Sequence, residues 1–478
     1  MAPAGTALRP YQQEARRAVQ AEWDAGHTRT LLVLPTGTGK TVVFARVAED
    51  RVRAGGRVLI LAHRGELLEQ AAQKLLRTTG LRCAVEKAEQ TSLGAFERVA
   101  VGSVQSLGRP DRLARFAPDH FDTIIIDEAH HATGDSYLRI LEHFPDARVL
   151  GVTATPDRGD LKNLGTVFDS LAYEYSLPQA IADGYLCPIQ ALTIPLKLDI
   201  GGVAVTAGDF SAGQLGSALD PYLEQIAAEM AGICTGRRTV VFLPLVDTSK
   251  KFCAILNAHG LRAAEVNGQS PDRARTLAAF AAGEYDVLCN SMLLTEGWDC
   301  PAVDCIAVLR PTKSRALYSQ MVGRGTRLCP ERGKRELLLL DFLWLTERHE
   351  LCRPADLICT DRAVAARMTE DIAASGGPVE LAEAEQKASG EVLAQREEAL
   401  AKQLEAMRRR KKRLVDPLQY QMSIQAEDLA GYVPAFGYEA APVSEAQAEA
   451  TTASTTPARK ITIELQTASA LRWEREKV

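Results

Sequence analysis

The chain has 478 residues, of which 46% are hydrophobic and 24% are charged, so it is long and apolar enough for two or more folded domains. Lys and Arg number 56 against 61 Asp and Glu, a net charge of −5, which excludes binding to nucleic acid through bulk basicity. No apolar run approaches the roughly 20 residues of a membrane span, and no secretory signal is visible, so we expect a cytoplasmic protein. The ten cysteines are then expected as reduced thiols, and because none forms a C-x-x-C pair, no zinc site is expected.

Short apolar runs alternate with helical stretches in two successive parts of the chain. This alternation predicts repeated βαβ units around parallel sheets, and therefore an α/β fold with two tandem domains whose sheets are flanked by helices. The first set of predicted strands is Leu31–Leu34, Val58–Ala62, Val99–Ser103, Thr123–Asp127 and Val149–Thr153. The second set is Thr239–Leu243, Arg262–Val266, Asp286–Asn290, Cys305–Leu309 and Leu337–Asp341.

Composition sets the expected domain boundaries. The stretch from Leu186 to Asp220 is rich in Gly and contains Pro188 and Pro195, which favours a connector or an inserted hairpin. Glu380 to Leu414 has the composition of a long exposed helix that ends in a basic run, and the chain after it is expected to be partly disordered. We therefore expect a first domain over 1–180, a connector over 181–235, a second domain over 236–370 and a helical, basic accessory region with a flexible tail over 371–478.

The stretch Thr36-Gly37-Thr38-Gly39-Lys40-Thr41 lies directly between an apolar strand and a helical run. The glycines let the backbone wrap around phosphate oxygens, Lys40 can reach the β- and γ-phosphates, and Thr41 can ligate Mg²⁺. Asp127 and Glu128 end another predicted strand, at the sheet edge where α/β proteins bind ligands. Asp127 is placed to hold Mg²⁺ and Glu128 to activate a water, so the two motifs together predict a site that hydrolyses ATP.

With these motifs in place, the chain resembles the superfamily 2 helicases and translocases of the DEAD/DEAH type, over about Leu8 to Asp341. The resemblance implies two RecA-like lobes, with adenine recognition by Arg9 and Gln12. It further implies coupling of hydrolysis to nucleic acid by His130, Thr153 and Thr155, and nucleotide contacts from Gly297, Asp299 and Gln320. Arg324 and Arg327, in Gln320-Met321-Val322-Gly323-Arg324-Gly325-Thr326-Arg327, are expected to stabilise the γ-phosphate in catalysis when the lobes close. They lie on one face if the helix predicted from Ser314 to Gly323 continues into them.

The strand-end loops carry the candidates for a nucleic-acid track, which needs hydroxyl and amide groups more than a basic surface. By the same resemblance these are His63, Arg64, Ser103, Gln105, Ser106 and Thr295. The motifs look most like bacterial and prophage-type members related to RadD, XPB and the type III restriction motor subunits, which makes DNA the expected partner and RNA the alternative. Pro354-x-Asp356 with Glu385-x-Lys387 faintly resembles the PD…ExK metal site of nucleases. A nuclease is nevertheless rejected, because Glu385 and Lys387 lie in a stretch of ordinary helix composition.

The basic run from Arg408 to Arg413 has two readings, a grip on duplex backbone or a solvated helix end. The sequence thus favours a monomeric ATP- and Mg²⁺-dependent DNA helicase or translocase without a membrane association. An RNA helicase and a non-processive ATP-gated DNA-binding switch stay open as alternatives.

Overall fold

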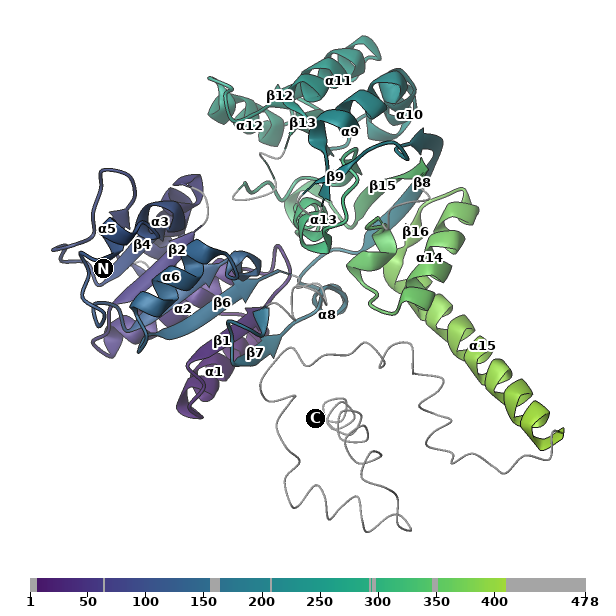
Figure 1. Cartoon of the computed structure of the whole chain (residues 1–478). Helices are drawn as coiled ribbons and strands as arrows, with labels where there is room; N and C mark the ends of the chain where they lie inside the picture. The colour runs from purple at the N-terminus through teal and green to yellow at the C-terminus, as the bar shows by residue number, and fades with distance from the viewer. Residues whose placement is uncertain are drawn as a thin grey trace.

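The computed structural model describes residues 7–62, 65–154, 164–206, 209–291, 294, 298–345 and 351–409. They form two α/β lobes, followed by a long helix that projects away from the second lobe (Figure 1). The two tandem RecA-like domains predicted from the sequence are confirmed.

The first lobe is built on a seven-stranded sheet in the order β3-β4-β2-β5-β6-β1-β7. Every pairing in it is parallel. Its strands are β1 (Arg29–Val33), β2 (Val58–Ala62), β3 (Ala84–Glu86), β4 (Val99–Ser103), β5 (Thr123–Asp127), β6 (Arg148–Thr153) and β7 (Ser170–Glu174). Its helices are α1 (Pro10–Asp24), α2 (Lys40–Arg53), α3 (Gly65–Thr79), α4 (Val104–Leu107), α5 (Pro110–Leu113), the 3₁₀ helix η1 (Ala129–His131), α6 (Asp135–His143) and α8 (Leu177–Ala182).

The second lobe has a seven-stranded sheet in the order β12-β13-β11-β14-β15-β8-β16, parallel except for β16. Its strands are β8 (Ile189–Asp199), β11 (Thr239–Phe242), β12 (Ala263–Val266), β13 (Val287–Asn290), β14 (Cys305–Val308), β15 (Leu337–Leu345) and β16 (Val379–Glu380), with a separate antiparallel hairpin of β9 (Val205–Thr206) and β10 (Asp209–Phe210). Its helices are α9 (Ala212–Leu219), η2 (Asp220–Tyr222), α10 (Leu223–Cys234), α11 (Val246–Ala258), α12 (Arg273–Ala282), α13 (Arg315–Val322), η4 (Pro330–Arg332), η5 (Pro354–Leu357), α14 (Arg362–Ser375) and α15 (Leu381–Arg409).

The segment expected as a connector over 181–235 is corrected by the structure. Strand β8 lies inside the second sheet, paired with β15, and α9 and α10 pack on the same lobe. The strand was not predicted from the sequence because it contains Pro195, and proline interrupts the hydrogen-bond ladder of a sheet. The register shifts here, with Ile194 opposite Phe342 and Lys197 opposite Leu343, so Pro195 is accommodated in a bulge. The chain crosses between the lobes in the few residues before β8.

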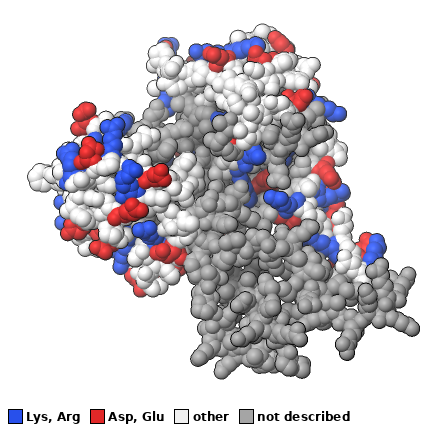
Figure 2. Space-filling model, viewed as in Figure 1, with Lys and Arg blue, Asp and Glu red and all other residues white. Residues whose placement is uncertain are grey.

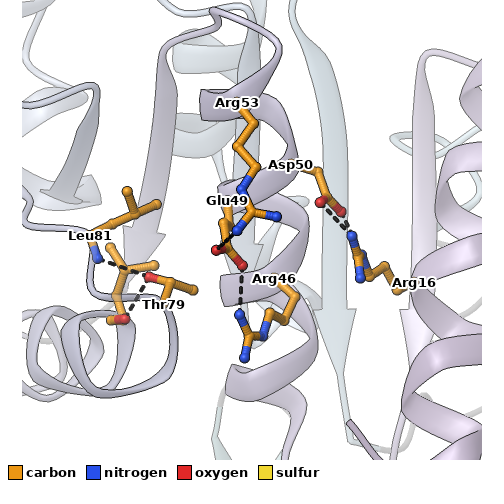
Figure 3. Close-up of polar contacts among 8 residues, drawn as sticks. Arg16, Arg46, Glu49, Asp50, Arg53, Thr79 and Leu81 are labelled. Carbon is orange, nitrogen blue, oxygen red and sulfur yellow. Dashed lines mark hydrogen bonds and ion pairs between the residues drawn. The ribbon is translucent and has the colours of Figure 1, made fainter. Parts of the chain in front are cut away.

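Apolar clusters cover both faces of each sheet. One cluster fills the face of the first sheet that packs on α1, α2 and α3, and it continues through Leu186 and Cys187 into the second lobe. The other faces have their own clusters. Helix α1 is also fixed to α2 by the ion pair between Arg16 of α1 and Asp50 of α2, whereas Glu49 pairs with Arg46 and Arg53 within α2 itself (Figure 3). This fastening matters because both helices begin at the phosphate-binding loop.

Helix α15 corresponds to the long helix predicted for Glu380 to Leu414, over the residues that the structure describes. It pairs with α14 along its first part, and its remainder projects outward (Figure 1). Arg408 and Arg409 end it, and the rest of the basic run, from residue 410 onward, lies outside the described residues. All ten cysteines are free thiols in the structure. None of the helices in the described ranges is long and apolar enough to cross a membrane.

Candidate active site

The phosphate-binding loop joins the end of β1 to the start of α2. Gly37 and Gly39 have φ of 94° and 83°, a conformation that side chains with a Cβ adopt only under strain. The buried Thr38 hydroxyl donates to the Pro35 carbonyl over 2.7 Å and closes the turn. Helix α2 begins at Lys40, so its unpaired N–H groups and its positive dipole end face the loop. This geometry fits a phosphate chain.

The start of α1 supports this loop from the opposite side. The Tyr11 hydroxyl and the Gln12 Nε2 both donate to the Thr38 carbonyl, over 2.5 and 2.8 Å. Gln12 Oε1 in turn accepts from the Arg9 backbone over 3.0 Å. The Arg9 guanidinium lies 5.0 Å from the centre of the Tyr185 ring, in the segment that leads to the second lobe. The predicted adenine-reading residues therefore adjoin the loop, and their contact with a base stays a prediction.

Two carboxylates face the loop from the end of β5. Lys40 Nζ lies 3.6 Å from Glu128 Oε1, and Glu128 has a φ of 53°, in the left-handed region that favours glycine. Burial and the Glu128 charge raise the pKa of Asp127 to about 6. Burial also opposes ionisation of Glu128, but the charges of Lys40, His130 and Arg324 outweigh it and lower its pKa. Glu128 is thus the more acidic of the two carboxyls.

Two buried polar atoms of this site are available to a ligand or a cation. Among the described residues, the buried Thr36 Oγ1 and Glu128 Oε2 have no hydrogen-bond partner. The Thr41 hydroxyl and the Asp127 carboxylate are the oxygen ligands that Mg²⁺ prefers, and a cation beside Asp127 would favour its ionised form. The residues present therefore fit a nucleoside triphosphate with Mg²⁺.

Strand β6 joins this site to the predicted coupling residues. The Leu34 backbone donates to the Thr153 carbonyl over 3.0 Å, and Thr153 Oγ1 lies 3.5 Å from His130 Nδ1. His130 Nδ1 is also 3.5 Å from Glu128 Oε2. A chain of contacts thus runs from the phosphate-binding loop through Thr153 and His130 to the Glu128 carboxylate. Thr155 lies outside the described residues.

The predicted arginines of the second lobe lie beyond α13 and not on its continuation. The helix ends at Val322 with Gly323 as its C-cap, so the expectation that Arg324 and Arg327 lie on an extended helix face is wrong. The buried Arg324 donates from Nη1 to the Trp298 carbonyl over 2.8 Å, and Arg327 forms an ion pair with Asp299. Burial lowers the pKa of Arg327 to about 10, which leaves it charged at neutral pH. Gln320 is buried in α13, and Gly297 lies outside the described residues.

The two lobes meet at the phosphate-binding loop. A Cβ placed on Gly323 would lie 2.5 Å from Thr36 Cβ, and one on Gly37 would lie 3.1 Å from Leu186 Cδ2 and 3.3 Å from Arg327 Cγ. Leu186 also pairs with Arg327 as an antiparallel bridge, and the Cys187 backbone donates to the Thr326 carbonyl over 2.8 Å. Sequence reasoning missed Tyr185 and Leu186. The one sign of them in the sequence is that an aromatic and an aliphatic residue stand at the start of the Gly- and Pro-containing stretch that separates the two sets of predicted strands.

The predicted nucleic-acid residues are described only in part. Ser103 is buried at the end of β4, Gln105 is exposed in α4, and Ser106 accepts a hydrogen bond from the Ala88 backbone over 3.2 Å. His63, Arg64 and Thr295 lie outside the described residues. On the face that Figure 2 shows, Lys and Arg side chains are interspersed with Asp and Glu over both lobes.

Two family models match the chain. The model for the type III restriction enzyme res subunit matches residues 5–158, and the helicase conserved C-terminal domain matches residues 223–329. IRC3 of Saccharomyces cerevisiae, provisionally named an ATP-dependent helicase, is 32% identical over 357 residues, 70% of this chain and 51% of that protein. The endonuclease subunit of the type I restriction enzyme EcoAI from Escherichia coli is 27% identical over 384 residues, 72% of this chain and 47% of that protein.

A solved structure extends this similarity. The fragment of a provisionally assigned HsdR subunit of a type I restriction enzyme from Vibrio vulnificus YJ016 superposes with a TM-score of 0.57 at 28% identity, over 72% of this chain and 65% of the fragment. The two lobes, the phosphate-binding loop and the arginines define a superfamily 2 helicase fold. The chain belongs to the superfamily 2 helicases, in the group related to type III restriction motor proteins. It spans about half the length of the two curated relatives.

Proposed function

We propose that the chain is a DNA-dependent ATPase that couples hydrolysis between its lobes to translocation on DNA or to unwinding. The observation that carries this proposal is the contact between the lobes, where Gly323 lies against Thr36 and Arg327 lies against Gly37. This contact brings the arginines of one lobe to the phosphate-binding loop of the other. Hydrolysis then depends on how the lobes sit, which is what a motor requires.

The residues of the site divide the chemistry between them. Lys40 and the N–H groups of the loop hold the β- and γ-phosphates, and Thr41 with Asp127 would hold Mg²⁺, which offsets phosphate charge when bound. Glu128 takes a proton from the water whose oxygen attacks the γ-phosphorus, while the bond to the bridging oxygen breaks and ADP leaves. Arg324 and Arg327 stabilise the charge that develops on the transferred group.

In the structure each arginine has a partner in its own lobe. Arg324 donates from Nη1 to the Trp298 carbonyl, and Arg327 pairs with Asp299. Each guanidinium carries five N–H donors, so both arginines can bind phosphate oxygens in addition to these partners. Bound ATP supplies those oxygens and favours the closed arrangement of the lobes, whereas hydrolysis and release remove them. Each cycle would thereby change the grip of the strand-end loops on DNA, the polymer suggested by the relation to restriction enzymes.

Steady-state ATP hydrolysis tests this proposal directly. We would measure it without polynucleotide and with single-stranded DNA, duplex DNA, forked DNA and RNA. Stimulation by DNA above RNA supports the DNA motor, and the reverse order favours an RNA helicase. Lys40→Ala and Glu128→Gln should each abolish turnover, and hydrolysis retained in either variant would contradict the site assignment. Nucleotide-dependent DNA binding without turnover in the wild type would favour the switch.

A further inference from the structure

The turn that carries the two arginines is held by hydrogen bonds from a lysine that no sequence motif includes. Lys334 Nζ donates to the Gly325 carbonyl over 2.6 Å and to the Pro301 carbonyl over 3.1 Å, and it also donates to the Val303 carbonyl. An ammonium group has three N–H donors, so these three carbonyls use its full capacity. Gly325 lies between Arg324 and Arg327 in the chain.

The other two carbonyls belong to the segment that holds the partners of the arginines. Pro301 and Val303 follow Trp298 and Asp299 within a few residues. Trp298 accepts from Arg324, and Asp299 pairs with Arg327. One lysine therefore joins the turn that presents the arginines to the segment that restrains them.

A tight turn fixes the position of Lys334 itself. Cys329 and Lys334 pair as an antiparallel bridge around η4, and Gly333 has a φ of 69°, which lets the chain reverse there. Arg332 Nη2 donates to the Ala281 carbonyl over 3.0 Å and anchors this turn to the end of α12. Lys334 is thus fixed both by the hydrogen bonds of its side chain and by the turn that contains it, unlike a solvated lysine on the surface.

We propose that Lys334 is a positioning residue for Arg324 and Arg327, acting through its hydrogen bonds to the carbonyls of Gly325, Pro301 and Val303. It contacts no part of the phosphate-binding loop in the described structure and belongs to the other lobe. Its removal takes a charged donor from the Pro301 and Val303 carbonyls and leaves the Gly325 carbonyl with the weaker donor Cys187 Sγ, at 3.5 Å, so the turn with the arginines relaxes away from its present place. The inference rests on the proposed hydrolysis between the lobes.

Three variants test this inference: Lys334→Met, Lys334→Arg and, as a matched control, Arg335→Met at the exposed neighbouring position. In DNA-stimulated hydrolysis, we expect Lys334→Met to lower kcat by about 10- to 100-fold, because a displacement near 1 Å can cost that much. KM for ATP should change by less than about twofold, because the phosphate-binding loop lies on the first lobe. Lys334→Arg should recover part of kcat, since a guanidinium also donates to carbonyls, and Arg335→Met should match the wild type.

Amide hydrogen exchange without nucleotide separates the two proposals. We expect faster exchange in Lys334→Met over residues 298–304 and 323–328, with exchange in the first lobe unchanged. Wild-type exchange in these segments, or wild-type kcat, would overturn the role of Lys334. If the wild type itself hydrolysed no ATP, the proposed function would fail, and the exchange comparison would still decide whether Lys334 holds the turn. If Lys334→Met does not fold, the same comparison is made with Lys334→Arg. We expect this variant to have a lower kcat than the wild type and faster amide exchange in the two segments, and wild-type values in both readouts would overturn the role of Lys334.

Discussion

Gly323 offers the most direct test of the contact between the lobes. A methyl group added there would lie 2.5 Å from Thr36 Cβ, 2.9 Å from Thr36 Cγ2 and 2.7 Å from the Ser319 carbonyl oxygen. Carbon atoms in contact normally stay about 3.5–4.0 Å apart. Neither Thr36 Cβ nor a backbone oxygen can rotate away, so Gly323→Ala must separate the arginine turn from the phosphate-binding loop by about 1 Å.

A displacement of that size can lower a rate by about 100-fold when it separates reacting groups. We therefore expect Gly323→Ala to reduce kcat for ATP hydrolysis by about two orders of magnitude. Thermal unfolding should show that each lobe stays folded. The matched control is Gly390→Ala, because Gly390 lies in α15 with open space around its Cβ position. That variant should keep wild-type turnover and gain about 0.5–1 kcal/mol of stability, since alanine favours helix. Wild-type kcat in Gly323→Ala would refute a catalytic contact at this place.

Two further predictions concern stability. Burial raises the pKa of Asp341 from 3.8 to about 6 despite the nearby Arg353, so the folded state binds the proton more tightly and stability falls as pH rises between those values. Asp341→Asn should therefore be more stable than the wild type by up to about 3 kcal/mol at pH 8 and show no gain near pH 3.5, as urea unfolding across pH can show; a gain independent of pH would contradict this cause. Arg112→Met should destabilise the first lobe by about 3–5 kcal/mol, because it leaves the fully buried Glu86 without its ion pair. Arg115→Met, at an exposed position, is the control for this change in urea unfolding, and equal midpoints for the two variants would show that the buried pair contributes nothing.

Much of the architecture could be predicted from the sequence because the central strands are continuous apolar runs. Val58–Ala62, Val99–Ser103 and Thr123–Asp127 match β2, β4 and β5 residue for residue. These strands are buried on both faces, so their hydrophobicity alone marks them. The phosphate-binding loop and the acidic pair could also be located from the sequence, because each needs fixed residue types directly at a strand end.

The missed elements lie where burial is incomplete or where a tertiary contact overrides local preference. Strand β8 contains Pro195, and its place in the sheet depends on pairing with β15, which local composition does not encode. The edge strand β7 is only half-buried and lacks a continuous apolar run. The helix predicted from Ser314 to Gly323 does end at Val322, but the close contact of Gly323 with Thr36, a residue almost three hundred positions earlier, is a tertiary contact that local sequence does not encode.

The same contacts explain why a site split between two lobes can respond to what the lobes bind. Leu186 touches the loop at Gly37 and pairs with Arg327, so the crossing between the lobes adjoins both halves of the site. Because cores and interfaces are close-packed, a shift of the second lobe cannot be absorbed locally and must move the arginine turn against the phosphates. Hydrolysis would then report the relative position of the lobes, and any polymer that bridges them would set that position. The close packing at Gly37 and Gly323 is therefore the structural basis on which the proposed coupling depends.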